Sequence, residues 1–380
     1  MIIVCVFTEP IQRHLLRATL LLLVLTFSSA SASGEETADS QRLSIVVFTP
    51  TTENNTYWPE VHSIMRAAAS DLDINLQIHE FDVADRFMMI PSGLNLLTTH
   101  PLPDAAVFSV EFGQTLPLIT AAEQSGVPFF INGPLFPEEL SELGDKPGQE
   151  YQHWIGYFLE DEETKGYLLG QQLIAAARKA DHQNTGITIQ IAGINGARSW
   201  YGSILREAGL RRAIGEHSNV ELLQMVYTRW TPEEGQRMAN QLLARYPEIS
   251  AIWAASDELA LGAAKAIRNH PTNGDKHVFT GGLDLSGAGL NAVSEGKLLA
   301  TIASTELIWA QVIVDLYDHL NGFAVQNDSL LLFSPIVADK DTAEKIKTAI
   351  ADFKAIDFRM FSRFHHGSDA RHLSSLAEPW

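Results

Sequence analysis

Cysteine is almost absent from this chain, which has one such residue, Cys5, among 380. Disulfide frameworks and cysteine-based zinc sites are therefore excluded. The sequence also lacks the H-E-x-x-H, P-loop and G-x-G-x-x-G patterns of metalloproteases, nucleotide hydrolases and dinucleotide enzymes. The adjacent His365 and His366 have no partner at metal-ligand spacing. These absences predict that the protein is not an enzyme and has no metal or cofactor.

Positive charge is scarce. Lysine and arginine number 27 against 46 aspartate and glutamate residues, so the formal net charge is −19. A strongly acidic surface repels nucleic acid and anionic lipid. The charge balance therefore excludes nucleic acid as a partner.

Long apolar runs are also missing, apart from one near the start. Arg13 and Arg17 precede the apolar run Ala18–Phe27, and Ala30-Ser31-Ala32 has the A-x-A pattern of a cleavage site. This run is shorter than the about 20 residues needed to span a bilayer. Residues 1–32 are therefore expected to be a secretory signal peptide, and the mature protein is expected in the periplasm.

The most informative stretch that is present runs from Ala251 to Ser304. Its apolar runs Ala251–Ala255, Val278–Leu283 and Leu299–Ala303 have the length and composition of buried strands, and helical patterns separate them. Strands that alternate with helices predict a parallel sheet with right-handed crossovers. Ligands bind to such sheets beyond the carboxyl ends of the strands.

Ser256, Asp284 and Ser304 each follow one of these predicted strands. Because they come at the same end of neighbouring strands, they are candidates to line one pocket. Helix capping is the alternative, and it is the favoured interpretation for Asp257.

The segments AIWAASDELALGAAKAI, VFTGGLD and EGKLLATIA resemble, in order and spacing, the type I periplasmic binding proteins. The resemblance implies an α/β fold with two doubly wound Rossmann-like lobes joined by a three-crossover hinge. It implies an N-terminal lobe of residues 43–135 plus 305–334. The C-terminal lobe is expected to comprise 150–303 plus 335–365, followed by a tail, 366–380. The first crossing is expected within the loop-like Pro134–Gln149.

The resemblance also implies a ligand site with an aromatic residue from each lobe. Asn55, Tyr57 and Trp58 resemble the family's loop after the first strand, in which two aromatics stack on the ligand and the asparagine hydrogen-bonds to it. Trp230 matches the opposing aromatic of the second lobe. Aromatic cover over the edge of a core is the alternative role.

Polar ligand contacts follow from the same resemblance. Arg206 lies in an R-x-x-G like that of the family, with a surface ion pair as the alternative and Arg198 as the fallback. Asn132 and Asp284 fall where the family carries aspartates. Ser256 and Ser304 replace an asparagine and a glutamine, and Gly133 replaces a common arginine, so the ligand need not be ribose or glucose. The expected ligand-binding set is Asn55, Tyr57, Trp58, Asn132, Arg206, Trp230, Ser256, Asp284 and Ser304.

The function implied is that of a monomeric periplasmic receptor for a small sugar-like ligand, which delivers it to the permease of an ABC importer. The alternative is a ligand-sensing subunit that presents a bound signal to a membrane sensor kinase or a similar receptor. Both alternatives share the pocket and differ in the partner that contacts the lobes.

Overall fold

The structure is a computed structural model that describes residues 42–51, 56–82, 89–111, 113–144, 146–180, 188–270, 277–325 and 330–376. The chain divides into two units, Met1–Gln41 and Arg42–Trp380, and the described residues belong to the second. The expected signal peptide and Asn55 therefore lie outside the described residues.

The first lobe is built on a six-stranded sheet in which every neighbouring pair is parallel. In spatial order its strands are β11 (Leu330–Phe333), β5 (Trp154–Glu160), β4 (Phe129–Asn132), β3 (Ala105–Ser109), β1 (Ser44–Thr51) and β2 (Asn75–Asp82). Its helices are α2 (Tyr57–Asp71), α3 (Met89–Thr98), α4 (Thr115–Ser125), α5 (Pro137–Leu143) and α11 (Leu307–Leu320).

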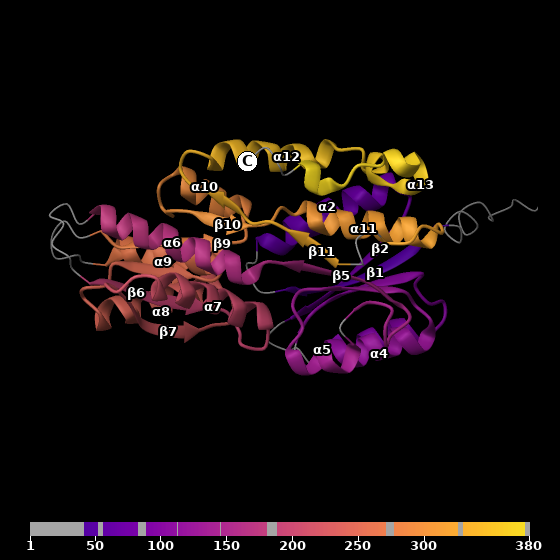
Figure 1. The fold of residues 1–380 in the computed structure, drawn as a ribbon, viewed down its shortest axis with the longest axis horizontal. Coiled ribbons are helices and arrows are strands. Elements are labelled where there is room, and N and C mark those ends of the chain that lie inside the picture. Colours follow the sequence, from indigo (N-terminus) through magenta and orange to yellow (C-terminus); the bar gives the residue numbers. More distant parts are fainter. Residues whose placement is uncertain are drawn as a thin grey trace, which may run out of the picture. The chain divides into compact units, whose positions relative to one another are not determined.

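Helices cover both faces of this sheet (Figure 1). Alternate side chains of β1 enter two different cores: Ile45 and Val47 pack with α2 and α11, whereas Val46 and Phe48 pack with α4. Side chains alternate across a strand, so an apolar run with no polar member is the pattern of a sheet buried on both faces. This accounts for the doubly wound lobe that the apolar strands predicted.

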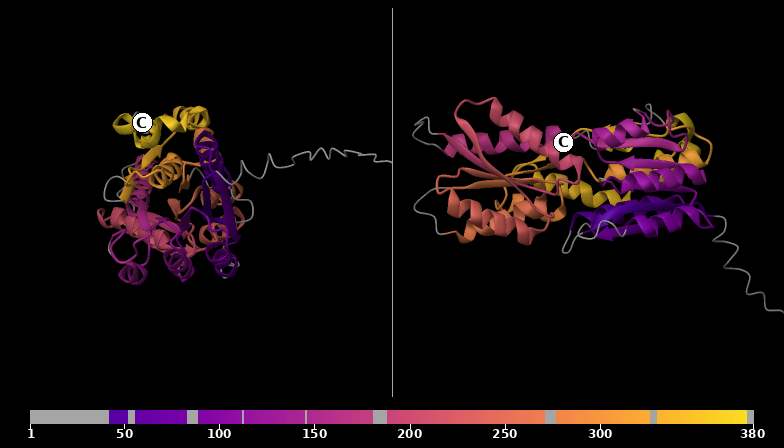
Figure 2. Two further views of the ribbon diagram at one scale, coloured as in Figure 1. Left: turned by 90° about the vertical axis from the view of Figure 1, so that its right-hand side faces the viewer. Right: turned by 90° about the horizontal axis from the view of Figure 1, so that it is seen from below.

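The second lobe repeats this design with one difference at its edge. Its sheet has the order β12 (Ile336–Ala338), β10 (Thr301–Ala303), β9 (Phe279–Leu283), β8 (Ala251–Ala254), β6 (Ile189–Asn195) and β7 (Val220–Tyr227). The edge strand β12 is antiparallel to β10, and the other pairs are parallel. Its helices are α6 (Glu162–Ala180), α7 (Tyr201–Gly215), α8 (Pro232–Arg245), α9 (Asp257–Asn269), α10 (Gly287–Ser294) and α12 (Ala343–Asp352), and Figure 2 shows them on both sides of the sheet.

The described chain passes between the two sheets three times, from β5 to α6, from β10 to α11, and from β11 to β12. The expected position of the first crossing, Pro134–Gln149, was wrong. That segment contains the short helix α5, and β5, which was expected in the second lobe, pairs with β4 and β11 of the first sheet. Phe158 of β5 is buried with Phe130 in the first-lobe core. The crossing therefore lies at Asp161.

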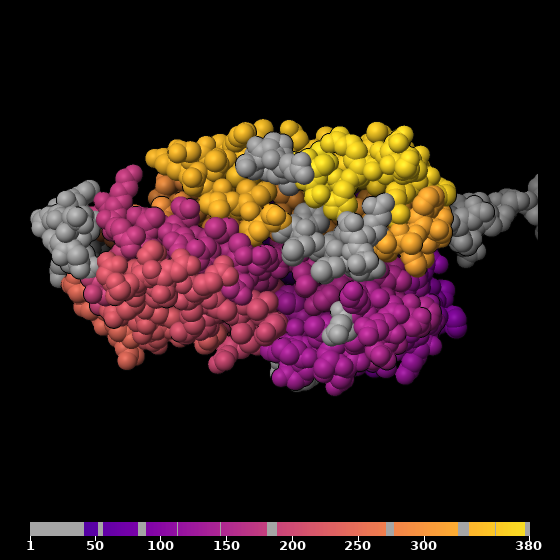
Figure 3. Space-filling view, in the orientation of Figure 1, coloured from indigo at the N-terminus to yellow at the C-terminus, as the bar shows by residue number. Residues whose placement is uncertain are grey.

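The C-terminal segment lies along both lobes, which corrects its expected assignment to the second lobe and a tail. Helix α12 packs on α10 of the second lobe, whereas η3 (Phe353–Ala355) and η4 (Phe358–Phe361) pack on α2 of the first. Beyond α13 (Arg363–His366) and η5 (Gly367–Asp369), η6 (Leu373–Leu376) packs on α11. A buried carboxylate holds this segment, because Asp318 accepts hydrogen bonds from the backbone N–H groups of Arg363 and Phe364. Figure 3 shows the segment in yellow at the surface.

None of the helices within the described ranges is both long and apolar enough to cross a bilayer.

Candidate functional site

A cavity of about 150 Å³ lies between the carboxyl ends of the two sheets. Residues that follow β3, β4, β8 and β9 border it, which is where parallel sheets bind ligands. It is lined by Pro50, Tyr57, Trp58, Ser109, Val110, Glu111, Asn132, Gly133, Glu160, Glu162, Trp200, Arg206, Trp230, Ser256, Glu258, Asp284 and Trp309. The structure thus brings together every expected residue except Asn55, which is outside the described ranges, and Ser304.

Each lobe contributes a pair of indoles to the cavity wall. In the first lobe, the rings of Trp58 and Trp309 meet edge to face with centroids 5.4 Å apart. The Trp309 indole N–H donates to the hydroxyl of Tyr57 over 3.4 Å. In the second lobe, Trp200 and Trp230 meet edge to face at 5.7 Å. Trp309 and Trp200 were not predicted, because Trp309 lies within a long apolar helix and Trp200 immediately precedes α7.

Two cavity residues have positive φ angles, a backbone conformation that residues other than glycine rarely adopt. Trp230 has φ of +70° and Asp284 has φ of +129°. Such conformations cost about 1–3 kcal/mol each and cluster at ligand-binding sites. The absence of a side chain at Gly196 leaves room for the Trp230 ring, since a Cβ at Gly196 would lie 1.8 Å from that ring. The surrounding fold therefore keeps Trp230 in a backbone conformation that is unfavourable for the residue by itself.

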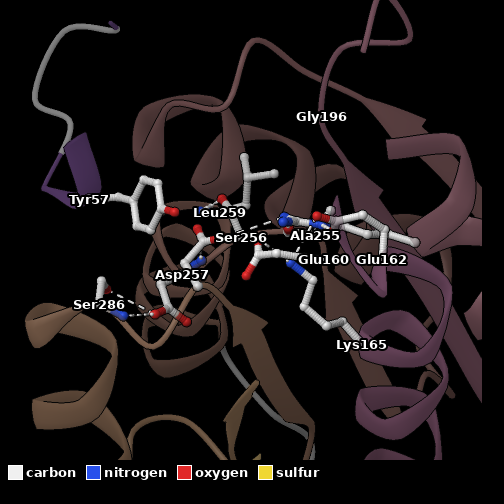
Figure 4. Close-up of polar contacts among 12 residues, drawn as sticks. Tyr57, Glu160, Glu162, Lys165, Gly196, Ala255, Ser256, Asp257, Leu259 and Ser286 are labelled. Atoms are coloured by element: carbon white, nitrogen blue, oxygen red, sulfur yellow. Dashed lines mark hydrogen bonds and ion pairs between the residues drawn. The ribbon is translucent and has the colours of Figure 1, made fainter. Parts of the chain in front are cut away.

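Arg206, which lines the cavity, is the centre of a buried polar network. Figure 4 shows its partners Glu162 and Ala255, with Lys165 close to Glu162. Its Nε donates to Glu162 over 2.5 Å, and its Nη1 donates to the carbonyl oxygen of Ala255 over 2.5 Å. Nη1 also lies 3.4 Å from Asp284 Oδ1. Burial acts to lower the pKa of Arg206, but the charges of Glu162 and Asp284 outweigh it and raise the pKa. Arg206 thus stays charged, oriented by groups other than the ligand.

Lys165 supports this network from outside the cavity. Its Nζ donates to Glu160 and to Glu162, over 2.9 Å in each case, and its side chain is fully buried. Burial acts to raise the pKa of Glu160, but the charge and hydrogen bond of Lys165 overcome it and leave that pKa below its usual range. Sequence reasoning missed Lys165, because its polar surroundings at the start of α6 are also typical of a solvated helix end.

Ser304 lies beside this network rather than in the cavity wall. It is buried, it follows β10 at the second crossing, and its side chain hydrogen-bonds to Glu160. The expectation that it lines the pocket was therefore wrong, because the side chain is turned toward the carboxylate between the two crossings.

Asp284 and Asp257 form a second acidic pair beside the cavity. Asp257 is fully buried and accepts hydrogen bonds from the N–H and O–H groups of Ser286, over 3.0 Å and 2.8 Å. Burial raises the pKa of Asp257 to about 7. Burial also raises the pKa of Asp284, against the charge of Arg206 and with a contribution from Asp257. Ser256 caps α9 by accepting from the Leu259 N–H, and it also lines the cavity.

The two lobes touch beside the cavity. Oε1 of Glu258 in the second lobe accepts from the backbone N–H and the hydroxyl of Thr56 in the first, over 3.0 Å and 2.8 Å. Glu60 Oε2 accepts from the N–H of Gly287 over 3.0 Å. These contacts link the first turn of α2 to the first turns of α9 and α10, so the structure has the lobes closed over the cavity.

No group of three or more histidine, cysteine, aspartate or glutamate side chains among the described residues is arranged to hold a metal ion.

The chain is similar to known proteins in sequence and in fold. The model of the family described as "Periplasmic binding protein domain" matches residues 45–322. The ribose import binding protein of Escherichia coli (strain K12) is 31% identical over 150 residues, which are 39% of this chain and 46% of that protein. In that alignment the chain thus spans about half the length of its relative.

Two further relatives cover more of the chain. The D-ribose/D-allose-binding protein of Pseudomonas aeruginosa is 22% identical over 303 residues, which are 76% of this chain and 85% of that protein. The crystal structure of a periplasmic sugar-binding protein from Pseudomonas fluorescens has 27% identity and a TM-score of 0.75, covering 88% of this chain and 98% of that one.

Proposed function

Because the chain belongs to the periplasmic binding protein family, we propose that it is a periplasmic solute-binding protein for a sugar or a similar polar ligand. The observation that carries this proposal is the closed cavity, to which each lobe contributes two indoles and several hydrogen-bonding side chains. Flat aromatic faces cover the apolar faces of a ring, and paired polar groups satisfy its hydroxyls, which are costly to bury unpaired.

The size of the cavity supports a ligand the size of a single sugar ring. A volume of about 150 Å³ has room for on the order of ten water-sized groups. This volume suits a single sugar ring. The names of the relatives from Escherichia coli, Pseudomonas aeruginosa and Pseudomonas fluorescens, which are described as binding ribose, allose or sugar, support the same ligand class.

The proposed roles follow the positions of the side chains. Trp58 and Trp230 stack on the ligand from opposite lobes, with Tyr57 beside them. Arg206 and Asp284 bind its hydroxyls as a charged pair, and Asn132 and Ser256 complete the polar contacts. Asn55 precedes this aromatic loop and remains a proposed ligand contact.

Binding works by favouring the closed form. A ligand that touches both lobes gains its full contacts only when Thr56 meets Glu258 and Glu60 meets Gly287. That difference in affinity shifts the equilibrium from open to closed. In this proposal the protein is exported, its signal peptide is cleaved after Ala32, and it acts as a monomer. It delivers the ligand to the permease of an ABC importer, and the permease distinguishes the closed form from the open form.

The test is a thermal-shift and calorimetry screen of the purified chain from residue 33 with pentoses, hexoses, polyols and amino sugars. A ligand present at about 100 times its dissociation constant stabilises the folded state by about 2.7 kcal/mol, which raises the melting temperature of a chain of this length by about 4 °C. Trp58→Ala and Trp230→Ala should each remove this rise. If no member of the panel binds, the proposal is wrong.

A further inference from the structure

The cavity has a surplus of acidic side chains. Five carboxylates line it, those of Glu111, Glu160, Glu162, Glu258 and Asp284. Arg206 is the one basic side chain among the lining residues of the described chain, and Lys165 adds a second positive charge behind the wall. A neutral sugar needs hydrogen-bond partners, but it does not need this excess of negative charge.

Both positive charges are already matched within the protein. Lys165 bonds to Glu160 and Glu162, and Arg206 bonds to Glu162 at 2.5 Å. The two cations thus neutralise these two glutamates. Asp284 lies at a longer distance, 3.4 Å, from an Arg206 that is already paired.

Glu258 meets no basic side chain in the described part of the chain. Its carboxylate is buried and accepts both of its hydrogen bonds from uncharged donors of Thr56. A buried carboxylate is costly without a cation. Burial raises the pKa of Asp284 although the charge of Arg206 acts to lower it, and the negative charges of Asp257 and Glu258 add to the rise.

The aromatic walls also favour a cation. Four indoles, those of Trp58, Trp200, Trp230 and Trp309, line the same cavity. A cation over an indole face gains about 0.5–1 kcal/mol at exposed sites and about 2 or more when it is desolvated. Arg206 already uses this interaction, because its guanidinium lies 4.9 Å from the centre of the Trp200 ring.

We propose that the preferred ligand is a monosaccharide that carries a protonated amino group, and that this group binds between the Glu258 and Asp284 carboxylates and the indole faces. The inference rests on the proposed function and narrows its ligand class. It also predicts that uronic acids and sugar phosphates are rejected, because they add negative charge to an acidic cavity.

The experiment compares matched pairs by calorimetry with the intact mature protein: glucosamine with glucose, galactosamine with galactose, and mannosamine with mannose. We expect at least one amino sugar to bind tenfold or more tighter than its hydroxyl parent. If neutral sugars bind and none of the amino partners binds more tightly, this inference fails while the proposed function stands. If neither member of any pair binds, this inference fails, and the proposed function fails as well if the pentoses and polyols of the wider panel do not bind either.

A charge-removing variant locates the amino group. Glu258→Gln keeps an acceptor for Thr56 but removes the charge, so it should weaken binding of the amino sugar about tenfold more than binding of the hydroxyl parent. Glu295→Gln removes the same charge from an exposed ion pair with Lys297 and should change neither affinity. Equal losses for both sugars in Glu258→Gln would overturn the assignment of Glu258, and the melting temperatures would show whether the variant is folded.

Discussion

Replacing Lys165 with methionine tests the buried network beneath the cavity. Methionine matches the lysine side chain as far as its ε-carbon but leaves the carboxylates of Glu160 and Glu162 without the ammonium that lies 2.9 Å from each. The Lys165 side chain is fully buried and that of Glu162 is 3% exposed, so water replaces the ammonium poorly. Removing one partner of a buried ion pair costs about 3–5 kcal/mol. We expect a loss of this size in the free energy of unfolding at neutral pH.

The loss should depend on pH, and its sign follows from Glu160. In the native protein the pKa of Glu160 is lowered, so its contribution to stability is present at neutral pH and disappears on acidification. Without Lys165, burial raises that pKa, and the carboxyl takes up a proton as the pH falls. The deficit of the variant should therefore be largest near pH 7.5 and smaller near pH 5.

Urea unfolding at both pH values measures this effect, and the midpoint at neutral pH should fall by about 1 M or more. Adding Glu160→Gln to Lys165→Met should recover part of the loss, because one buried charge is then removed. Lys297→Met, which breaks an exposed pair with Glu295, serves as the control and should cost about 1 kcal/mol or less. A Lys165→Met deficit that is the same at both pH values would refute the reasoning.

Three further changes probe the cavity and the cores. Trp230→Gly should be more stable than Trp230→Ala by roughly 1 kcal/mol, because glycine accepts φ of +70°. Neither variant should bind the ligand in calorimetry. A glycine variant that is less stable than the alanine variant would argue against backbone strain at Trp230. Thr56→Val removes a hydroxyl contact to Glu258 across the lobes, so ligand affinity should fall severalfold while the melting temperature without ligand stays the same; unchanged affinity would show that this contact does not favour closure. Burial raises the pKa of Asp315 to about 7, so the folded protein holds a proton that the unfolded chain releases near pH 4. Stability should therefore fall as the pH rises between these values, and Asp315→Asn should reduce this pH dependence in urea unfolding at pH 5 and 8. An unchanged pH dependence would rule out Asp315 as its source.

Local patterns in the sequence predicted the lobes and most of the cavity wall, because a parallel sheet places the residues after its strands at one edge. Asn132 is the last residue of β4, Ser256 and Asp284 follow β8 and β9, and all three reach the cavity. A short apolar strand has the same appearance in either sheet, so the pattern of β5 did not reveal which lobe contains it. Only its pairing with β4 and β11 decides this.

The remaining cavity residues depend on contacts between distant segments. Trp309 lies within helix α11 and Glu258 within helix α9, and a core or a solvated face is the ordinary environment of a helical residue. Their place in the cavity follows from how the lobes meet, as in the contact of Glu258 with Thr56, which is 202 residues away in sequence. The charge surplus of the cavity is likewise a sum over both lobes that no single motif contains.

The positions of the tryptophan residues allow ligand binding to be followed by the intrinsic fluorescence of the protein. Four indoles surround the cavity, whereas Trp154 and Trp253 are fully buried in the cores of the two lobes. A bound guest displaces water from the first group and leaves the second untouched. The tryptophan emission spectrum should therefore contain one component whose wavelength shifts when the ligand binds and a second component that stays constant. Phenylalanine replacements of Trp309 and Trp200, one at a time, would then show how strongly each wall responds, without any attached dye.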